Sequence, residues 1–223
     1  DGPLRSIVFI KLVEQGSTVL AYAALRRAID WVGKKNVYFL VFEENRFTLD
    51  ALDLIEPANV LAIRSTRPFV AIADTVRALA TLRSNRVDAA IDLEFFARGS
   101  AVLSFLSGCR TRIGLHGRAG EAPYRGDLMT HRVRYNPYFH TAQTFRLMVE
   151  ALNYPSGTLL PFPVTAPGPD EVPPLMVPSE SELIEVSGLI QAAVPTRKCI
   201  SLILLNPNCS DILPLRRWPE QNY

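Results

Sequence analysis

Acidic side chains follow three of the apolar runs that predict buried β-strands, at residues 6–12, 36–42 and 87–91. The acidic residues at these strand ends are Glu14, Glu43, Glu44, Asp92 and Glu94. Because the carboxyl ends of parallel strands meet at one edge of a sheet, where open α/β sheets bind ligands, we expect these carboxylates to share that edge. A carboxylate there can act as a general base, and the alternative for each is a solvated loop charge or a helix cap.

Basic side chains fall in loops and helix starts near the same predicted edge. They are Arg64, Arg67, Arg98, Arg118, Arg125, His131 and Arg132. Guanidinium groups bind phosphate and carboxylate through paired hydrogen bonds, so a cluster of them suits an acceptor that carries either group. The alternative for each residue taken singly is a scattered surface charge.

A second polar loop follows the apolar run at residues 199–205. It reads Asn-Pro-Asn-Cys-Ser-Asp at residues 206–211, and Arg216 and Trp218-Pro219-Glu220 come after it. Small polar residues and arginines at the end of a strand can hold a diphosphate. Pro219 and Glu220 suit the first turn of a following helix.

The remaining patterns exclude several classes of protein. Neither a dinucleotide fingerprint, a P-loop nor a G-x-S-x-G elbow is present. The three histidines lack metal-ligand spacing, and Cys109, Cys199 and Cys209 form no C-x-x-C pair, which favours a reducing compartment. The net charge of +2 gives no case for nucleic-acid binding, and no apolar run approaches the ~20 residues of a membrane span. We therefore expect a cytoplasmic globular protein with no metal and no nucleic-acid partner.

Strand and helix patterns alternate through the first 152 residues, which predicts a parallel sheet with right-handed crossovers. The polar turn at residues 13–18 joins the first strand to a helix at 17–32, with Ser17 as N-cap and Gly33 as C-cap. Residues 116–137 have little apolar periodicity, and we expect them to form a long functional or mobile loop.

Eight of the 17 prolines lie within residues 153–178, which predicts an extended linker between domains, the alternative being a surface loop within one domain. The capping box Ser179-Glu180-Ser181-Glu182 and the run at 199–205 then begin new α/β structure. We therefore divide the chain into an α/β domain at 1–152, a linker at 153–178, and the start of a second α/β domain at 179–223. One helix and one strand cannot bury a core, so we expect the rest of that domain outside this sequence.

Three stretches together resemble glycosyltransferase family 9, the heptosyltransferase-like enzymes of lipopolysaccharide and surface-glycan biosynthesis. Residues 7–25 are similar to the family's opening strand, I-K-x-x-x-x-G-D and helix. Residues 87–133 resemble its I-D-L-Q-G, K-S-A and R-R-I-G-F run and the T-H-R-V that follows. Residues 205–220 are similar to its P-x-x-S and K-x-W-P-x-E at the start of the second domain.

The resemblance implies a GT-B-type α/β fold, in which a Rossmann-like parallel-sheet N-terminal domain binds the acceptor and a second Rossmann-like domain binds a nucleotide-sugar donor, such as ADP-heptose. It implies inverting, metal-independent transfer of a heptose-like sugar to a lipid-linked or glycan acceptor, with no cofactor. It places the enzyme at the cytoplasmic face of the inner membrane, in peripheral contact with it. By position the donor-binding residues are Asn208, Cys209, Ser210 and Arg216, and the acceptor-binding candidates are Gly16, Arg98, Arg125 and His131.

The chain departs from the family at the proposed base. The family's Gly-Asp is Gly16-Ser17 here, and a serine hydroxyl is too weak a base to replace a carboxylate. We therefore take Glu14 and Glu94, together with Ser17, as the catalytic candidates. Two alternatives stay open, a relative that binds glycan or nucleotide without turnover and another two-domain nucleotide-sugar enzyme such as an epimerase. Residues 1–223 alone are expected to be inactive.

Overall fold

The computed structural model describes residues 3–95, 97–117, 127–155, 173, 175, 177–193 and 221. The chain forms two compact units, Asp1–Met176 and Val177–Tyr223, and each is described by itself. Within the described residues of the second unit there is one helix, α7 (Glu180–Ala193). The predicted capping box begins it, because Ser179 Oγ accepts from Glu182 N at 3.3 Å and Glu182 Oε2 accepts from Ser179 N at 2.7 Å. The predicted strand at 199–205 lies outside the described residues.

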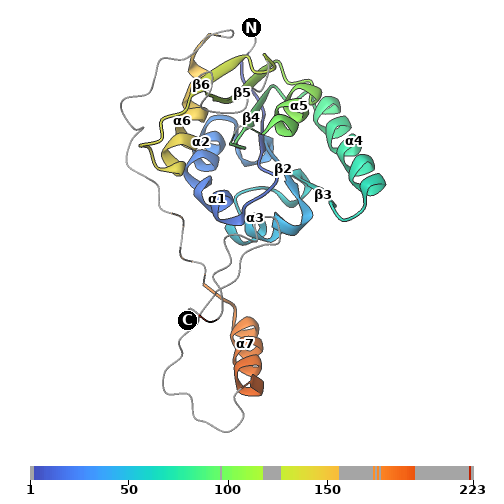
Figure 1. Cartoon of the computed structure of the whole chain (residues 1–223), viewed down its shortest axis with the longest axis vertical. Coiled ribbons are helices and arrows are strands. Elements are labelled where there is room, and N and C mark those ends of the chain that lie inside the picture. Colours follow the sequence, from blue (N-terminus) through green and yellow to red (C-terminus); the bar gives the residue numbers. More distant parts are fainter. Residues whose placement is uncertain are drawn as a thin grey trace. The chain divides into compact units, whose positions relative to one another are not determined.

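The first unit is built on a six-stranded parallel sheet of order β3-β2-β1-β4-β5-β6 (Figure 1). The strands are β1 (Ile7–Ile10), β2 (Val37–Phe42), β3 (Val60–Ile63), β4 (Ala89–Asp92), β5 (Thr111–His116) and β6 (His131–Arg134). This confirms the predicted α/β class and parallel sheet. The strand order reverses between β1 and β4, and the crevice beyond the carboxyl ends of such a pair is where doubly wound sheets bind ligands.

Helices cover both faces of the sheet, because the strands are apolar on both sides. Alternate residues of β1 point to opposite faces, so Ile7 and Phe9 pack in one apolar cluster and Val8 and Ile10 in another. The first cluster includes residues of α2 (Tyr22–Val32), α3 (Arg46–Leu52) and α6 (Thr141–Glu150), and α1 (Gln15–Leu20) packs beside α3 and α6. The second includes residues of α4 (Pro68–Ser84) and α5 (Arg98–Leu106). Short 3-10 turns occupy Lys34–Asn36, Glu43–Asn45, Pro57–Asn59 and Ala151–Asn153.

Two local expectations were wrong. The helix expected at residues 17–32 is two helices, and α1 begins at Gln15 with Glu14, not Ser17, at the N-cap position. Part of the expected loop at 116–137 is strand β6, which pairs with β5 in the register Ile113↔His131. Its sequence His-Arg-Val-Arg buries His131 and Val133 and leaves the two arginines half-buried, because successive side chains of a strand point to opposite faces of the sheet. Gly33 takes the predicted C-cap role, with φ of 82°.

No helix in the described part of the chain has both the length and the apolar character needed to cross a membrane.

Cys109 is sequestered between α5 and β5, and we expect it to resist alkylation in the folded protein. Its side chain is 1% exposed, and burial raises the pKa of its thiol to about 11. Since the thiolate is the nucleophile, labelling by iodoacetamide near pH 8 should be roughly 100-fold slower than in the denatured chain. Peptide mass spectrometry measures the rate, with the urea-unfolded protein as control. Equal rates in the two states would show that Cys109 is accessible.

Candidate functional site

A cluster of three charged side chains lies where the order of the strands reverses. The registers Ile10↔Leu40 and Ile10↔Asp92 bring the residues after β1 and β4 to the same edge of the sheet. Lys11 follows β1 directly and its side chain is fully buried. Its Nζ lies 3.1 Å from Glu94 Oε2 and 3.2 Å from Glu14 Oε2. One buried ammonium group therefore joins both of the carboxylates predicted as catalytic candidates.

The carboxylate of Glu94 holds the turn after β1 by hydrogen bonds. Its Oε1 accepts hydrogen bonds from the backbone N–H groups of Leu12 at 2.6 Å and Val13 at 3.1 Å. Its own N–H donates to Asp92 Oδ1 at 3.0 Å, and Ser100 Oγ donates to Asp92 Oδ2 at 2.8 Å. Since both carboxylate oxygens of Glu94 are engaged and its side chain is 8% exposed, a substrate proton has little access to it. The contacts of Glu94 are those of a group that holds the loop.

Glu14 is the exposed member of the cluster, with 57% of its side chain accessible. Its φ of 69° puts it in the left-handed region, which costs a non-glycine residue about 1–2 kcal/mol. Ser17 Oγ lies 2.9 Å from the backbone oxygen of Glu14 and 3.2 Å from its Oε2, and it donates to either. Lys11 and Ser17 thus hold one oxygen of Glu14, and within the described residues Oε1 accepts no hydrogen bond and forms no ion pair.

Gly16 adds open space beside this carboxylate. A Cβ atom built on Gly16 would meet nothing within 4 Å, and the backbone there is ordinary helix. Neither packing nor conformation therefore requires glycine at this position. Gly16 is exposed, so the start of α1 is open to solvent beside Glu14.

The arginines at the edge have different environments. Arg98 is the exposed first residue of α5, which follows β4, so it lies at the same edge as Glu14. Arg64 at the end of β3 is engaged in an ion pair, with Nε 2.8 Å from Asp74 Oδ2 and Nη2 2.9 Å from Oδ1. The guanidinium of Arg64 holds the pKa of Asp74 well below its usual range. Arg98 therefore lies exposed at this edge, whereas the guanidinium of Arg64 is engaged by Asp74.

The prediction that His131 lies at this edge was wrong. His131 is the first residue of β6, so it lies at the amino end of the parallel sheet, and its side chain is 2% exposed. Its Nε2 lies 2.8 Å from the backbone oxygen of Tyr154 and its Nδ1 lies 2.9 Å from Thr130 Oγ1. The ring therefore ties β6 to the end of the domain. The other candidates, Arg125, Asn208, Cys209, Ser210 and Arg216, lie outside the described residues.

Sequence reasoning missed Lys11. Lys11 lies within the apolar run at residues 6–12, where a single lysine gives no sign of its partner, and Glu94 is 83 residues away in the sequence. Two signals were available: carboxylates buried at strand ends need a cation nearby, and Lys11 is the lysine of the I-K-x-x-x-x-G-D stretch.

His116 at the carboxyl end of β5 gives this edge a pH-dependent stability. Burial, with Arg132 and Arg134, lowers the pKa of His116 below its usual 6.5, and Asp127 opposes this in part. The unfolded chain then binds the proton more readily, so stability should fall as pH falls through the region just below 6.5. Urea unfolding between about pH 7.5 and pH 5.5 measures the slope, and His116→Gln should flatten it. An unchanged slope in that variant would assign the effect to another group.

Solved glycosyltransferases share this fold. The E. coli heptosyltransferase WaaC with ADP-2-deoxy-2-fluoro heptose superimposes with a TM-score of 0.54 at 15% identity, over 70% of this chain and 50% of that one. The structure of E. coli WaaC with ADP gives a TM-score of 0.55 at 15% identity, over 68% of this chain and 48% of that one. The glycosyl transferase family 9 structure from Veillonella parvula DSM 2008 gives a TM-score of 0.63 at 12% identity, over 99% of this chain and 58% of that one. This chain thus spans about half the length of these proteins.

These similarities confirm that the fold is of the GT-B glycosyltransferase type over the region they share. Comparisons of the sequence with protein-family models and with curated proteins find no match. Among the described residues no group of three or more His, Cys, Asp or Glu side chains is arranged to hold a metal ion.

Proposed function

We propose that this chain contributes the acceptor-side domain of a family 9 glycosyltransferase. The observation that carries the proposal is the Glu14 carboxylate, exposed at the switch point of the sheet and held by Lys11 and Ser17. The shared fold with heptosyltransferase WaaC and the family 9 structure supports the reaction class. The WaaC structures contain ADP and an ADP-heptose analogue, which supports a nucleotide-sugar donor here.

In the proposed reaction Glu14 removes the proton of an acceptor hydroxyl. The acceptor oxygen attacks the anomeric carbon of the donor sugar from the side opposite the diphosphate. The new C–O bond forms as the bond to the diphosphate breaks, so the anomeric configuration inverts and the nucleoside diphosphate leaves. Lys11 keeps the Glu14 carboxylate in place, and the step uses neither metal nor cofactor.

The remaining parts of the proposal concern the acceptor, the donor and the cellular location of the reaction. Arg98 at the same edge suits a phosphate or carboxylate on the acceptor, consistent with a lipid-linked or surface glycan. Asn208, Cys209, Ser210 and Arg216 bind the donor diphosphate. The reaction takes place at the cytoplasmic face of the inner membrane.

Calorimetry and a transfer assay test this function. The whole protein should bind an ADP- or UDP-sugar and release the nucleoside diphosphate only when a glycan acceptor is present. Product formed without acceptor would indicate an epimerase-like enzyme instead. Absence of both donor binding and transfer would contradict the proposal.

A second candidate is a relative that binds nucleotide-sugar or glycan without turnover. It is favoured by Ser17, which stands where the family's proposed base would be. Donor binding without transfer to any acceptor would support it, because Glu14 would then not replace the missing carboxylate.

A further inference from the structure

A cavity lies at the amino ends of the central strands, at the edge of the sheet opposite Glu14. Its volume is about 790 Å³, within the range of small-molecule sites. The registers Ile7↔Val37 and Ile7↔Ala89 bring together the residues that precede β1, β2 and β4. We call this space the amino-edge cavity. Its charged and aromatic lining residues are Arg5, Tyr38, Arg83, Arg86, Asp88 and Arg110, none of which belongs to the proposed transfer site.

The amino-edge cavity is strongly basic. Among the described residues four arginines and one carboxylate line it, which gives a formal charge of +3 in a chain of net charge +2. The carboxylate, Asp88, is already engaged, because its Oδ2 accepts from Arg5 N at 2.9 Å and its Oδ1 lies 3.3 Å from Arg110 Nη2. Within the part of the chain that the structure describes, the guanidinium groups of Arg5, Arg83 and Arg86 form no ion pair. The side chains of the cavity therefore do not neutralise its charge.

Arg83 is held at the wall of the cavity. Its Nε donates to the backbone oxygen of Leu106 at 2.9 Å, and its two Nη atoms make no hydrogen bond to the described residues. Gly108, which also lines the cavity, makes room for this side chain, because a Cβ atom there would lie 3.2 Å from Arg83 Cγ. A guanidinium group held through Nε keeps its remaining donors for an external acceptor, and paired guanidinium donors match the oxygens of a phosphate.

Arg86 takes a backbone conformation that favours glycine. Its φ is 51°, and it follows Asn85, the C-cap residue of α4. Glycine or asparagine usually occupies this left-handed position at the end of a helix, because other side chains strain the backbone there. A cation at this end of α4 interacts favourably with the helix dipole, but Arg83 in the last turn already supplies one. The strained position of Arg86 therefore indicates a role for its guanidinium group in the cavity.

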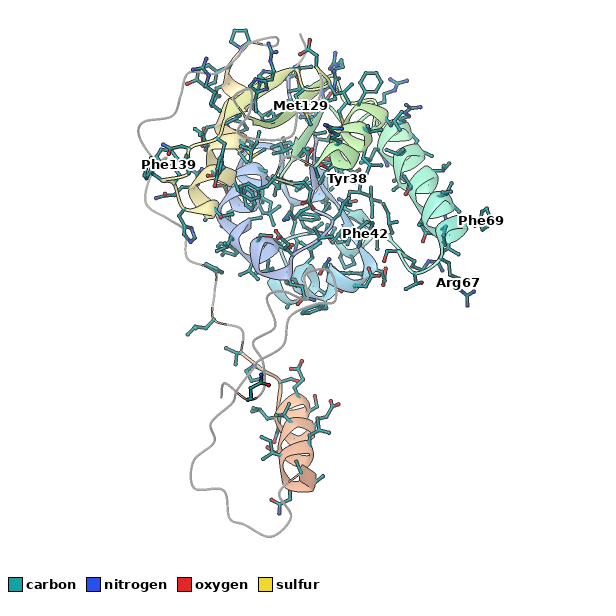
Figure 2. The ribbon with its side chains drawn as sticks, viewed as in Figure 1. Tyr38, Phe42, Arg67, Phe69, Met129 and Phe139 are labelled. Atoms are coloured by element: carbon teal, nitrogen blue, oxygen red, sulfur yellow. The ribbon has the colours of Figure 1, made fainter. Side chains whose placement is uncertain are left out.

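Apolar and aromatic side chains form another part of the lining. Leu82 and Val87 are 0% and 4% exposed and belong to the apolar cluster beneath α4 and α5. Tyr38 on β2 packs against the same cluster, and Figure 2 shows it within the domain. Its hydroxyl group makes no hydrogen bond to the described residues. The cavity thus offers a surface for an organic group beside its arginines.

We propose that the amino-edge cavity binds the diphosphate group of a small organic molecule, at a second site apart from the transfer site. Arg83 and Arg86 bind the phosphate oxygens, and Arg5 neutralises further charge. The organic group packs on Leu82 and Tyr38. A diphosphate carries several negative charges and therefore matches a lining of charge +3 better than a single carboxylate does. The site lies at the edge of the sheet opposite Glu14, so the inference does not depend on the proposed reaction.

Protection from phenylglyoxal, which modifies arginine, gives a readout at single residues. At a pyrophosphate concentration about ten times its Kd, modification of Arg83 and Arg86 should slow by about tenfold, because only the unliganded fraction reacts. ADP should protect the same two residues. Arg26, an exposed arginine of α2, is the matched control and should react at an unchanged rate. Binding confined to residues 208–216 would leave Arg83 and Arg86 unprotected, so failure of this proposal and failure of the proposed function are distinguishable.

Arg86→Gly separates binding from folding. Glycine relieves the backbone at φ of 51°, so the thermal midpoint should stay the same or rise. Loss of the guanidinium group should weaken pyrophosphate binding by about tenfold in calorimetry, as should Arg83→Gln, since a hydrogen bond to a charged group is worth about that factor. Arg26→Gln removes the same charge from α2 and should change the affinity by less than about twofold.

Three results would overturn the proposal. The first is failure of both pyrophosphate and ADP to bind the protein at low salt. The second is modification of Arg83 and Arg86 at equal rates with and without these ligands. The third is unchanged affinity in both Arg86→Gly and Arg83→Gln, because the anion would then bind elsewhere. Circular dichroism should show native folding in all variants, since every substituted side chain is exposed.

Discussion

Replacing Glu14 with Gln is expected to lower kcat for sugar transfer by about 10²–10⁴, the range that general base catalysis contributes. Glutamine keeps the size of the side chain and can still accept a hydrogen bond from Lys11 Nζ or Ser17 Oγ, which lie 3.2 Å from Glu14 Oε2. It cannot remove a proton from the acceptor. The KM for the acceptor should therefore change little, and the loss should appear in kcat.

Glu43→Gln is the matched control for this experiment. Glu43 is also an exposed carboxylate after a strand of the same sheet, but it lies beyond β2, not at the pair of strands where the order reverses. Its substitution should leave kcat within about twofold, in the range of surface changes remote from the reacting groups. A loss in Glu43→Gln as large as in Glu14→Gln would contradict the assignment of the base to Glu14.

A second variant tests whether Glu14 supplies the carboxylate that the family's aspartate would supply at position 17. Ser17 Oγ lies 3.2 Å from Glu14 Oε2, so an aspartate at position 17 would place its carboxylate in the same region. Adding Ser17→Asp to Glu14→Gln should therefore restore part of the lost kcat. Full activity in Glu14→Gln alone would instead remove Glu14 from the mechanism.

The sheet could be predicted because its first four strands are nearly continuous apolar runs, each followed by a helix pattern. Strand β6 could not, because His-Arg-Val-Arg has no such run and is ordered by pairing with β5. That omission misplaced His131, which was taken to lie in a loop near the carboxyl edge but begins a strand at the amino edge. A short edge strand is determined by its neighbour more than by its own sequence.

The candidate site could be predicted only in part. Position along the chain was enough to bring Glu14 and Glu94 to one edge, because strand ends in a parallel sheet coincide. Their different environments depend on Lys11 and on the backbone of Leu12 and Val13, which no local pattern reveals. The N-cap position was assigned to Ser17 because serine is a favoured N-cap residue, whereas Glu14 takes that position in a left-handed conformation that is uncommon for residues other than glycine.

Lys11→Met should have the largest effect on stability, with a loss of about 3–5 kcal/mol in the free energy of unfolding. Methionine fills a similar volume but leaves the buried Glu94 carboxylate without its cation, 3.1 Å from where Lys11 Nζ lay. Lys34→Met is the matched control. Lys34 Nζ lies 3.2 Å from Asp53 Oδ1, a similar distance, but the Asp53 side chain is 87% exposed. Its loss should cost no more than about 1 kcal/mol, as for other surface pairs.

A double-mutant cycle of Lys11→Met and Glu94→Gln separates the contribution of the Lys11–Glu94 ion pair to stability from that of the packing around the two side chains. Glu94→Gln alone leaves the Lys11 ammonium buried with only Glu14 beside it, whereas the double variant buries no charge at this position. If the ion pair is the source of the loss, the double variant should be more stable than the sum of the two single losses predicts. Urea unfolding followed by circular dichroism gives all four free energies. Strict additivity would mean that Lys11 stabilises the turn through its aliphatic chain, and Glu14 would then owe its position chiefly to Ser17.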